Sequence, residues 1–278
     1  MMKKWLTALF TLALVLLLGA CGGANEENND TTEAKKLVVG ASPTPHAEIL
    51  EAAKPLLEEK GIELEIKEFN DYILPNQALD SKELDANYFQ HIPYLEEQIA
   101  ENDYDFVNAG GIHIEPMGVY SKKYKSLDDV EKGATVLFSN SPADLGRVLA
   151  IFEKEGLIKL KDGVDKLNAK IEDIVENPKE LKFQPDYAPE LLPQIYNQDE
   201  GDLIVINSNF AIDAGLKPLE DSVAIESGED NPYVNVIAVR SGDEDKEEIK
   251  ALLEVLNSQD IKDFILETYD GAVIPASE

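Results

Sequence analysis

Apolar positions along the chain alternate between strand-like and helix-like patterns. Residues 37–41 form a short apolar run, which is typical of a buried strand. Residues 45–60 carry apolar side chains at helical spacing and are followed by Gly61. Pro55 lies inside this segment, so we expect the helix to be kinked or broken there. Residues 62–66 alternate between apolar and charged side chains, which indicates a second strand.

The same alternation continues through the rest of the chain. Ser141 and Pro142 are residue types that begin a helix, and the apolar stripe after them stops at Gly156. The other predicted elements are helices over 92–101, 246–256 and 260–269, and strands over 106–107, 135–138, 203–206 and 234–239. Strands separated by helices predict an α/β fold with largely parallel or mixed sheets. The length of 278 residues is compatible with two lobes.

The N-terminal segment has the pattern of a targeting sequence. Lys3 and Lys4 precede an apolar stretch over 5–18, which is shorter than the roughly 20 apolar residues that span a bilayer. It ends in Leu-Gly-Ala-Cys, which resembles the lipobox of bacterial lipoproteins, where the chain is cut before an acylated cysteine. We therefore predict a lipoprotein signal peptide over 1–20 and lipidation of Cys21. An ordinary signal peptide with an incidental cysteine is the alternative.

Residues 22–36 are almost entirely polar and cannot bury themselves. We expect a flexible tether over 21–36 that starts at the acylated Cys21. Acyl chains hold a protein at a bilayer by burying CH₂ groups, so the predicted location is the extracytoplasmic face of the cell membrane.

Composition excludes several classes of function. The chain has 55 acidic and 25 basic residues, a formal net charge of −30. A nucleic-acid partner requires a basic surface, and so does adsorption to an anionic membrane by a basic patch. The single cysteine excludes an internal disulfide framework.

The sequence offers no positive sign of catalysis or of metal binding. His46, His91 and His113 show no metal-binding spacing, and we expect structural or surface roles for His46 and His113. A zinc site formed by the three histidines with a carboxylate stays an alternative. No nucleophile elbow, P-loop or dinucleotide fingerprint occurs. We therefore predict no cofactor, no bound metal and no catalytic residue.

Four aromatic residues stand in polar, turn-rich segments rather than on apolar stripes. They are Tyr72, Tyr88, Phe89 and His91. Aromatic rings in such places form rigid pocket walls for apolar or thioether groups. The alternative is that they cover the edge of the core.

Three polar residues have positions suited to binding a small polar ligand. Arg147, one of only two arginines, lies off the apolar stripe of its predicted helix, and its guanidinium suits a ligand carboxylate. Asn207 follows the predicted strand 203–206, at the end where α/β sheets place ligand groups, and Asn235 enters the strand 234–239. An ion pair for Arg147, and turn or capping roles for the asparagines, are the alternatives.

At these residues the chain resembles the NlpA family of methionine-binding lipoproteins of bacterial ABC importers. The matching segments appear in order between about Leu37 and Ala272, over 71–76, 78–79, 85–91, 116–123, 145–147, 156–163, 175–179, 205–207 and 232–235. The resemblance implies a two-lobed substrate-binding protein with its ligand between the lobes. We expect lobe I over 37–117 plus 236–278 and lobe II over 118–235.

The resemblance also implies a role for each candidate residue. Tyr72 and Phe89 would hold the thioether side chain between them, with His91 beside them. Arg147 would bind the α-carboxylate, and Asn207 and Asn235 the rest of the amino-acid head group.

The implied ligand is methionine in its L and possibly its D form, and the implied partner is a permease with its ATPase. The protein would act as a monomer attached to the membrane by its lipid anchor, with no contact to nucleic acid. Tyr88 and the segment 139–144 depart from the family pattern, which bears on the form of the ligand. A binding protein for another small amino acid or a methionine analogue is the alternative, followed by a secreted amino-acid-processing enzyme.

Overall fold

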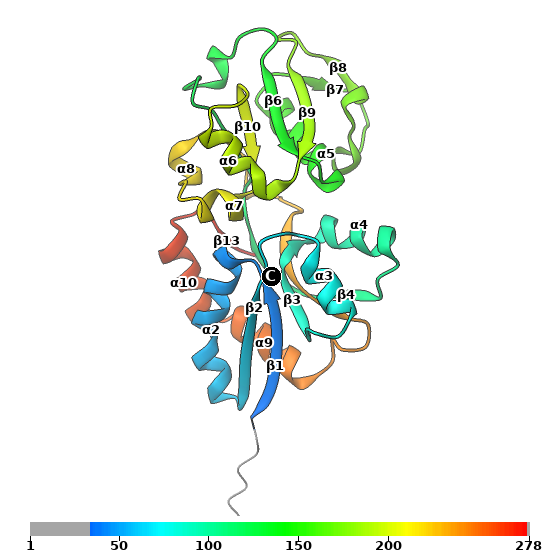
Figure 1. Ribbon diagram of the computed structural model, residues 1–278, viewed down its shortest axis with the longest axis vertical. Coiled ribbons are helices and arrows are strands. Elements are labelled where there is room, and N and C mark those ends of the chain that lie inside the picture. Colours follow the sequence, from blue (N-terminus) through cyan, green and yellow to red (C-terminus); the bar gives the residue numbers. More distant parts are fainter. Residues whose placement is uncertain (1–33, 277–278) are drawn as a thin grey trace, which may run out of the picture. The chain divides into compact units, whose positions relative to one another are not determined.

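The computed structural model describes residues 34–276, which form two lobes, each built on one β-sheet (Figure 1). The first sheet has the order β13-β4-β12-β3-β1-β2. Its strands are β1 (Lys35–Ala41), β2 (Ile62–Glu68), β3 (Ala86–His91), β4 (Phe106–Ile114), β12 (Val234–Arg240) and β13 (Ile274–Pro275). The second sheet has the order β11-β5-β10-β6-β9. Its strands are β5 (Gly118–Tyr120), β6 (Thr135–Ser139), β9 (Lys182–Tyr187), β10 (Leu203–Ile206) and β11 (Ser222–Ile225). A small two-stranded sheet pairs β7 (Lys159–Leu160) with β8 (Ile174–Glu176).

Both main sheets are mixed, which confirms the predicted fold class. In the first sheet β1 runs parallel to β2 and β3, whereas β12 is antiparallel to β3 and β4. In the second sheet β6 runs parallel to β9 and β10, whereas β5 is antiparallel to β10 and β11.

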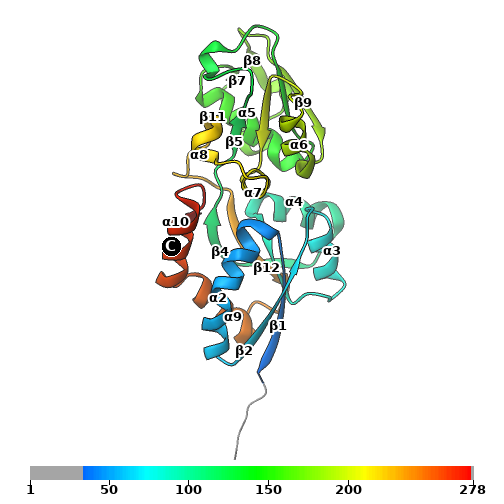
Figure 2. The same cartoon turned by 60° about the vertical axis from the view of Figure 1, so that its left-hand side comes forward.

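Helices cover both faces of each sheet (Figures 1 and 2). The first lobe has α2 (Glu48–Glu59), α3 (Leu74–Asp80), α4 (Ile92–Asn102), α9 (Glu247–Leu256) and α10 (Gln259–Tyr269). The second lobe has α5 (Pro142–Lys154), α6 (Leu192–Asn197), α7 (Ser208–Asp213) and α8 (Pro218–Asp221). Single helical turns complete the elements: η1 (Pro43–Ala47), η2 (Leu127–Asp129), η3 (Lys166–Asn168), η4 (Ile171–Asp173) and η5 (Pro189–Leu191).

The alternation of side chains along β12 explains this layering. Ile237 and Val239 join the core that also contains residues of α2, α9 and α10, whereas Val236 and Ala238 join the core under α3 and α4. Successive side chains of a strand point to opposite faces, so a strand that is apolar at every position needs a cover on both sides.

Three local features differ from the sequence predictions. Helix α2 is continuous through Pro55. Because Pro55 has no N–H, one carbonyl in the preceding turn lacks its helical partner. Pro55 is exposed, so this carbonyl faces solvent rather than the core. Strand β1 begins at Lys35, inside the expected tether, because the Lys35 N–H bonds the Gly61 carbonyl at 2.9 Å. Strand β4 extends to Ile114, well past the predicted residue 107, because Gly110 and Gly111 interrupt the apolar pattern without interrupting the pairing with β12.

Two chain segments join the lobes. The first, residues 115–117, connects β4 to β5, and the second, residues 226–233, connects β11 to β12. The two segments are hydrogen-bonded to each other, since the Glu226 N–H donates to the Met117 carbonyl at 2.9 Å. The second segment re-enters the first sheet at Val234, where β12 begins.

Across residues 34–276, no helix combines the length and the apolar character that a bilayer crossing requires. Cys21, the signal peptide and most of the tether lie outside the described residues.

Candidate functional site

A pocket between the two lobes contains all six residues predicted to bind a ligand. It encloses about 420 Å³ of empty volume, part of it open to solvent. The predicted residues on its wall are Tyr72, Phe89, His91, Arg147, Asn207 and Asn235. They come from a loop before α3, from β3, from α5, from the end of β10 and from β12, so only the folded chain brings them together. Their roles in binding stay a prediction.

The aromatic residues form one wall of this pocket. The ring centres of Tyr72 and Phe89 lie 6.0 Å apart, and Tyr94 lies 5.8 Å from Tyr72. A group held between two rings needs about 7 Å, which is two carbon–carbon contact distances. In this conformation Tyr72 and Phe89 therefore present adjoining faces rather than an open sandwich. Tyr88, the fourth aromatic candidate, is fully buried and bonds His113 instead of lining the pocket.

Tyr72 also joins the two lobes. Its hydroxyl donates to Asn209 Oδ1 at 2.6 Å, and its ring lies 5.0 Å from that of Phe210. Asn209 and Phe210 belong to α7 of the second lobe, so the lobes contact each other over the pocket.

His91 is neutral and caps the N-terminus of α4. Its Nδ1 accepts a hydrogen bond from the Tyr94 backbone N–H at 3.2 Å, which places it at the N-cap. Burial, together with the positive charge of Arg147, lowers the pKa of His91 well below its usual value. The remaining ring nitrogen, Nε2, then carries the proton and is a donor.

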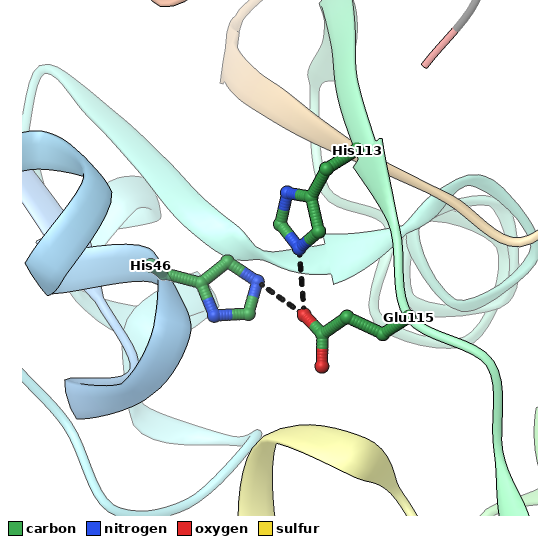
Figure 3. A group of neighbouring side chains, drawn as sticks. All are labelled: His46, His113 and Glu115. Atoms are coloured by element: carbon green, nitrogen blue, oxygen red, sulfur yellow. Dashed lines mark hydrogen bonds and ion pairs between the residues drawn. The ribbon is translucent and has the colours of Figure 1, made fainter. Parts of the chain in front are cut away.

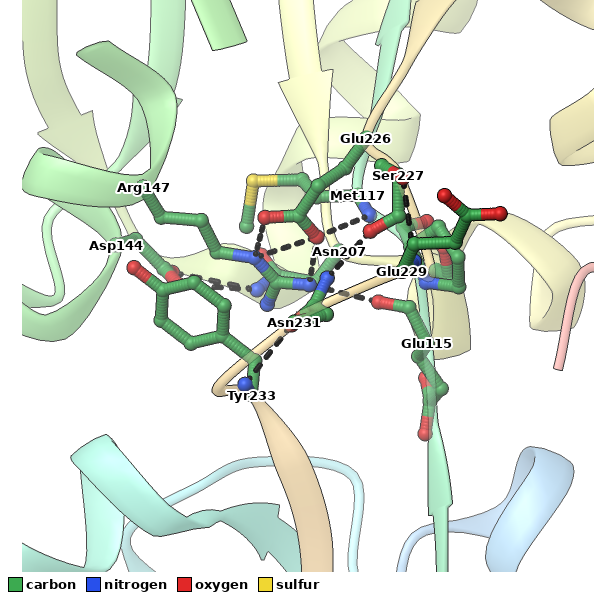
Figure 4. Close-up of polar contacts among 12 residues, drawn as sticks. Glu115, Met117, Asp144, Arg147, Asn207, Glu226, Ser227, Glu229, Asn231 and Tyr233 are labelled. Atoms are coloured by element: carbon green, nitrogen blue, oxygen red, sulfur yellow. Dashed lines mark hydrogen bonds and ion pairs between the residues drawn. The ribbon is translucent and has the colours of Figure 1, made fainter. Parts of the chain in front are cut away.

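The guanidinium of Arg147 is held on three sides (Figure 4). Its Nε lies 3.1 Å from both carboxylate oxygens of Glu226, and its Nη2 donates to Glu226 Oε2 at 2.6 Å. Nη2 also donates to the Glu115 backbone carbonyl at 2.7 Å, and the Tyr233 ring lies 4.2 Å from the guanidinium carbon. Burial opposes the charge, but Glu226 outweighs it and the pKa of Arg147 lies above its usual value.

Arg147 therefore makes the ion pair that the sequence left open, and it also lines the pocket. Among residues 34–276, its Nη1 has no hydrogen-bond partner. A buried guanidinium with one unused N–H₂ group can bind a further anion without releasing Glu226.

Two carboxyl groups balance this cation on the pocket wall. Asp144 is buried, and both of its oxygens lie 3.3 Å from Asn207 Nδ2. Burial raises the pKa of Asp144, and the charge of Arg147 opposes that rise. Asn207 Oδ1 is buried and lacks a partner within the described part of the chain, so it is an acceptor without a donor.

Glu115 is the second carboxyl group and lies in the first connecting segment. Its Oε1 is 3.2 Å from His46 Nε2 and 2.7 Å from His113 Nε2. Asn235 Oδ1 is 3.0 Å from the same His46 Nε2. We expected structural roles for His46 and His113, but nothing in the sequence indicated that the two residues meet. They are 67 positions apart, and only the folding of the first sheet brings η1 beside β4.

Sequence reasoning gave no site role to several residues that form or support the pocket, among them Tyr94, Glu115, Asp144, Glu226 and Tyr233. Glu115 precedes a segment singled out for its family resemblance, which is the one signal that pointed near it. Tyr94 and Glu226 lie in ordinary helix and loop patterns and gave no signal, whereas Tyr233 lies inside the matching segment 232–235. Ser141 has the predicted N-cap position of α5 but its side chain makes no capping bond, and its hydroxyl is buried without a partner among residues 34–276.

Two mixed α/β lobes joined by paired segments, with a pocket of both charges between them, define a two-lobed substrate-binding protein. Known proteins agree with this class. The methionine-binding lipoprotein MetQ of Bacillus subtilis is 51% identical over the full length of both chains. A crystal structure of a putative methionine-binding lipoprotein from Bacillus subtilis has a TM-score of 0.86 and 53% identity, covering 88% of this chain and 99% of its own. A nutrient-binding protein from Burkholderia cenocepacia, solved bound to methionine, has a TM-score of 0.81 and 40% identity, covering 87% and 100%.

The model of the NlpA lipoprotein family matches residues 37–277. The chain belongs to the NlpA lipoprotein family, which confirms the resemblance found in the sequence.

Proposed function

We propose that this protein binds methionine at the pocket between its lobes and delivers it to the permease of an ABC importer, whose ATPase drives uptake. The observation that carries the proposal is the presence of a guanidinium, Arg147, and two carboxyl groups, Glu115 and Asp144, on the wall of one pocket that also has an aromatic face. An amino-acid zwitterion has both charges a short distance apart, and an apolar side chain needs a dry wall beside them.

The head group would bind between the charged residues. The α-carboxylate would accept hydrogen bonds from Arg147 Nη1, the group left over from the contacts with Glu226 and Glu115. The α-ammonium would donate to Asn207 Oδ1, which otherwise stays unpaired, and to the Glu115 carboxylate. Each bond to a charged group contributes about 1.5–3 kcal/mol in a buried site.

The methylthio side chain would lie against Tyr72, Phe89 and Tyr94, with His91 at the edge of this wall. A thioether beside aromatic rings gains about 0.3–1.5 kcal/mol per contact beyond its burial. Burial of such a side chain contributes roughly 1.5–3 kcal/mol. With the head group, these contributions are of the size needed for micromolar or tighter affinity, about −8 kcal/mol.

The names of the relatives support methionine as the ligand. One is named a methionine-binding lipoprotein, another from Salmonella typhi a D-methionine-binding lipoprotein, and one solved neighbour contains methionine. The proposal includes both enantiomers. It also includes the lipid anchor at Cys21, the tether, the lobe limits at 117 and 235, and action as a monomer without catalysis.

Calorimetry with L-methionine, D-methionine and the other common amino acids tests the proposal directly. We expect micromolar or tighter binding of methionine and at least tenfold weaker binding of amino acids without a thioether. No heat from methionine, or equal affinity across the panel, would reject it. Recovery of the ligand unchanged after incubation distinguishes binding from an enzyme acting at the same pocket.

Arg147→Ala is the matched test of the site itself. Removing one partner of a buried, hydrogen-bonded charge pair costs about 2–5 kcal/mol, so methionine affinity should fall at least thirtyfold. Arg240→Ala is the control. Arg240 also donates to two backbone carbonyls, those of Leu79 and Leu84, and to the carboxylate of Asp243, but it does not line the pocket. Equal loss of affinity in both variants would mean that Arg147 acts only through the fold.

A further inference from the structure

Two histidines from distant parts of the sequence converge on one carboxylate oxygen beneath the pocket. His46, in η1, and His113, in β4, both point their Nε2 atoms at Oε1 of Glu115, as Figure 3 shows. The histidine side chains are 1% and 0% exposed, so neither is a surface residue. Of the three residues, only Glu115 reaches the wall of the pocket.

The neighbours of each ring determine which nitrogen carries the proton. Tyr88 is bonded to His113 Nδ1, and burial raises the pKa of the Tyr88 phenol well above its usual value, so the phenol keeps its proton and donates it. His113 Nδ1 is then the acceptor and Nε2–H the donor to Glu115. His46 Nε2 faces two oxygens, Glu115 Oε1 and Asn235 Oδ1, so it also carries a proton.

Both rings are neutral near physiological pH. Burial lowers the pKa of His46 to about 4 and that of His113 to about 3. The cluster thus supplies two N–H donors to Glu115 without adding positive charge. Burial raises the pKa of Glu115, whereas His46, Arg147 and the Asn209 backbone amide oppose that rise.

The same three side chains also have the composition of a metal site, but their geometry favours a hydrogen-bonded cluster. All three ligand atoms lie within 4.8 Å of one another. Two ligands of one tetrahedral zinc ion at about 2.0–2.1 Å are about 3.3 Å apart. The 2.7 Å between His113 Nε2 and Glu115 Oε1 is a hydrogen-bond length instead.

We propose that His46 and His113 are positioning residues that fix the Glu115 carboxylate as the acceptor for the ligand's α-ammonium group, and so set the pocket's requirement for an amine. Both donors occupy Oε1, which fixes the plane of the carboxylate and leaves Oε2 for a ligand. This inference rests on the proposed function, because it assigns the ammonium end of the same ligand.

The test compares methionine with its deaminated analogue, 4-(methylthio)butanoate, by calorimetry and by competition. The variants are His113→Leu, which removes the donor, and His113→Gln, which keeps an N–H donor at similar reach. We expect His113→Leu to weaken methionine binding about ten- to a hundredfold while the affinity for the analogue changes less than threefold. His113→Gln should recover most of the methionine affinity. An equal loss for both ligands would show a merely structural role and overturn the proposal.

A double-mutant cycle with Glu115→Gln gives a second, independent measurement. If His113 acts through Glu115, His113→Leu has little further effect on methionine affinity in the Glu115→Gln background. Additive losses would overturn the proposal, and so would stoichiometric zinc in the purified wild type that His113→Gln lacks. Failure of the wild type to bind methionine rejects the proposed function, whereas normal binding by His113→Leu rejects the positioning role alone.

Discussion

Arg147 and Glu226 form a buried ion pair, 2.6 Å from Nη2 to Oε2, between the helix that faces the pocket and the segment that joins the lobes. The same Nη2 donates to the Glu115 carbonyl in the other joining segment. One guanidinium thus contacts both connections between the lobes and the pocket between them. A ligand carboxylate bound at Nη1 would therefore contact the same guanidinium that is hydrogen-bonded to both connecting segments.

Removal of the charge of Glu226 should therefore make stability depend more strongly on the ligand. Glu226→Gln leaves the buried Arg147 without a full counter-charge, so the melting temperature of the ligand-free protein should fall by several degrees. A bound carboxylate restores the missing charge, and we expect a larger methionine-induced rise in melting temperature than in the wild type. Thermal melts with and without methionine measure both. A rise equal to that of the wild type would contradict the coupling.

The bond between Tyr72 and Asn209 should slow the opening of the pocket. Tyr72→Phe keeps the ring and removes the hydroxyl that donates across the lobes at 2.6 Å. One neutral hydrogen bond contributes about 0.5–1.5 kcal/mol, so methionine affinity should fall about two- to tenfold, chiefly through faster dissociation. Stopped-flow measurement of the dissociation rate checks this.

Tyr94→Phe is the control for this prediction, since its hydroxyl donates to the Tyr72 carbonyl within the first lobe. It should change the dissociation rate less than Tyr72→Phe does. If the two variants accelerate dissociation equally, the contact between the lobes has no special role.

Glu97 should make the protein less stable as the pH rises from about 4.5 to about 7. Burial, with the charges of Glu101 and Asp144, raises the pKa of Glu97 to about 7 in the folded chain. A carboxyl whose pKa is raised on folding holds its proton more tightly in the folded state, so the free energy of unfolding falls between the usual pKa of about 4.5 and the folded-state pKa of about 7 and is constant above that. Glu97→Gln removes that loss. Because the residue is partly exposed, we expect a gain of about 1 kcal/mol, or 2–4 °C, at pH 8.5.

The gain from Glu97→Gln should shrink below pH 7 and vanish near pH 4, where the carboxyl is protonated in both the folded and the unfolded chain. Glu96→Gln is the matched control, since the neighbouring Glu96 is exposed. Thermal melts from pH 4 to pH 8.5 measure this dependence. A gain that is independent of pH, or one that Glu96→Gln reproduces, would contradict the assignment.

Attachment to the membrane should depend on Cys21. Cys21→Ala removes the thiol that carries the acyl chains, so the protein should move from the membrane fraction to the soluble fraction. The variant should still bind methionine, because the pocket lies within residues 72–235. Fractionation with immunoblotting measures the distribution, and retention in the membrane fraction would reject the lipidation site.

The sequence by itself determined the order of the main strands and helices, the mixed α/β class and the family. Hydrophobic periodicity is a local property, and β10 and β12 stand nearly where their apolar runs predict them. The family follows from many short segments in order, which also pointed to Arg147, Asn207 and Asn235. Helix α2 is not broken at Pro55, because this residue lies off the apolar stripe on the exposed face, where water can take the place of the missing N–H.

Only the tertiary structure decided which groups meet. Glu226 and Arg147 are 79 positions apart, and His46 and Glu115 are 69 apart, so no local pattern relates them. Burial then changes their chemistry, because a charge removed from water needs a partner, and in this fold the partners come from the segments that join the lobes. The sequence therefore identified six of the thirteen residues that line the pocket, whereas the fold alone showed how its charges are held.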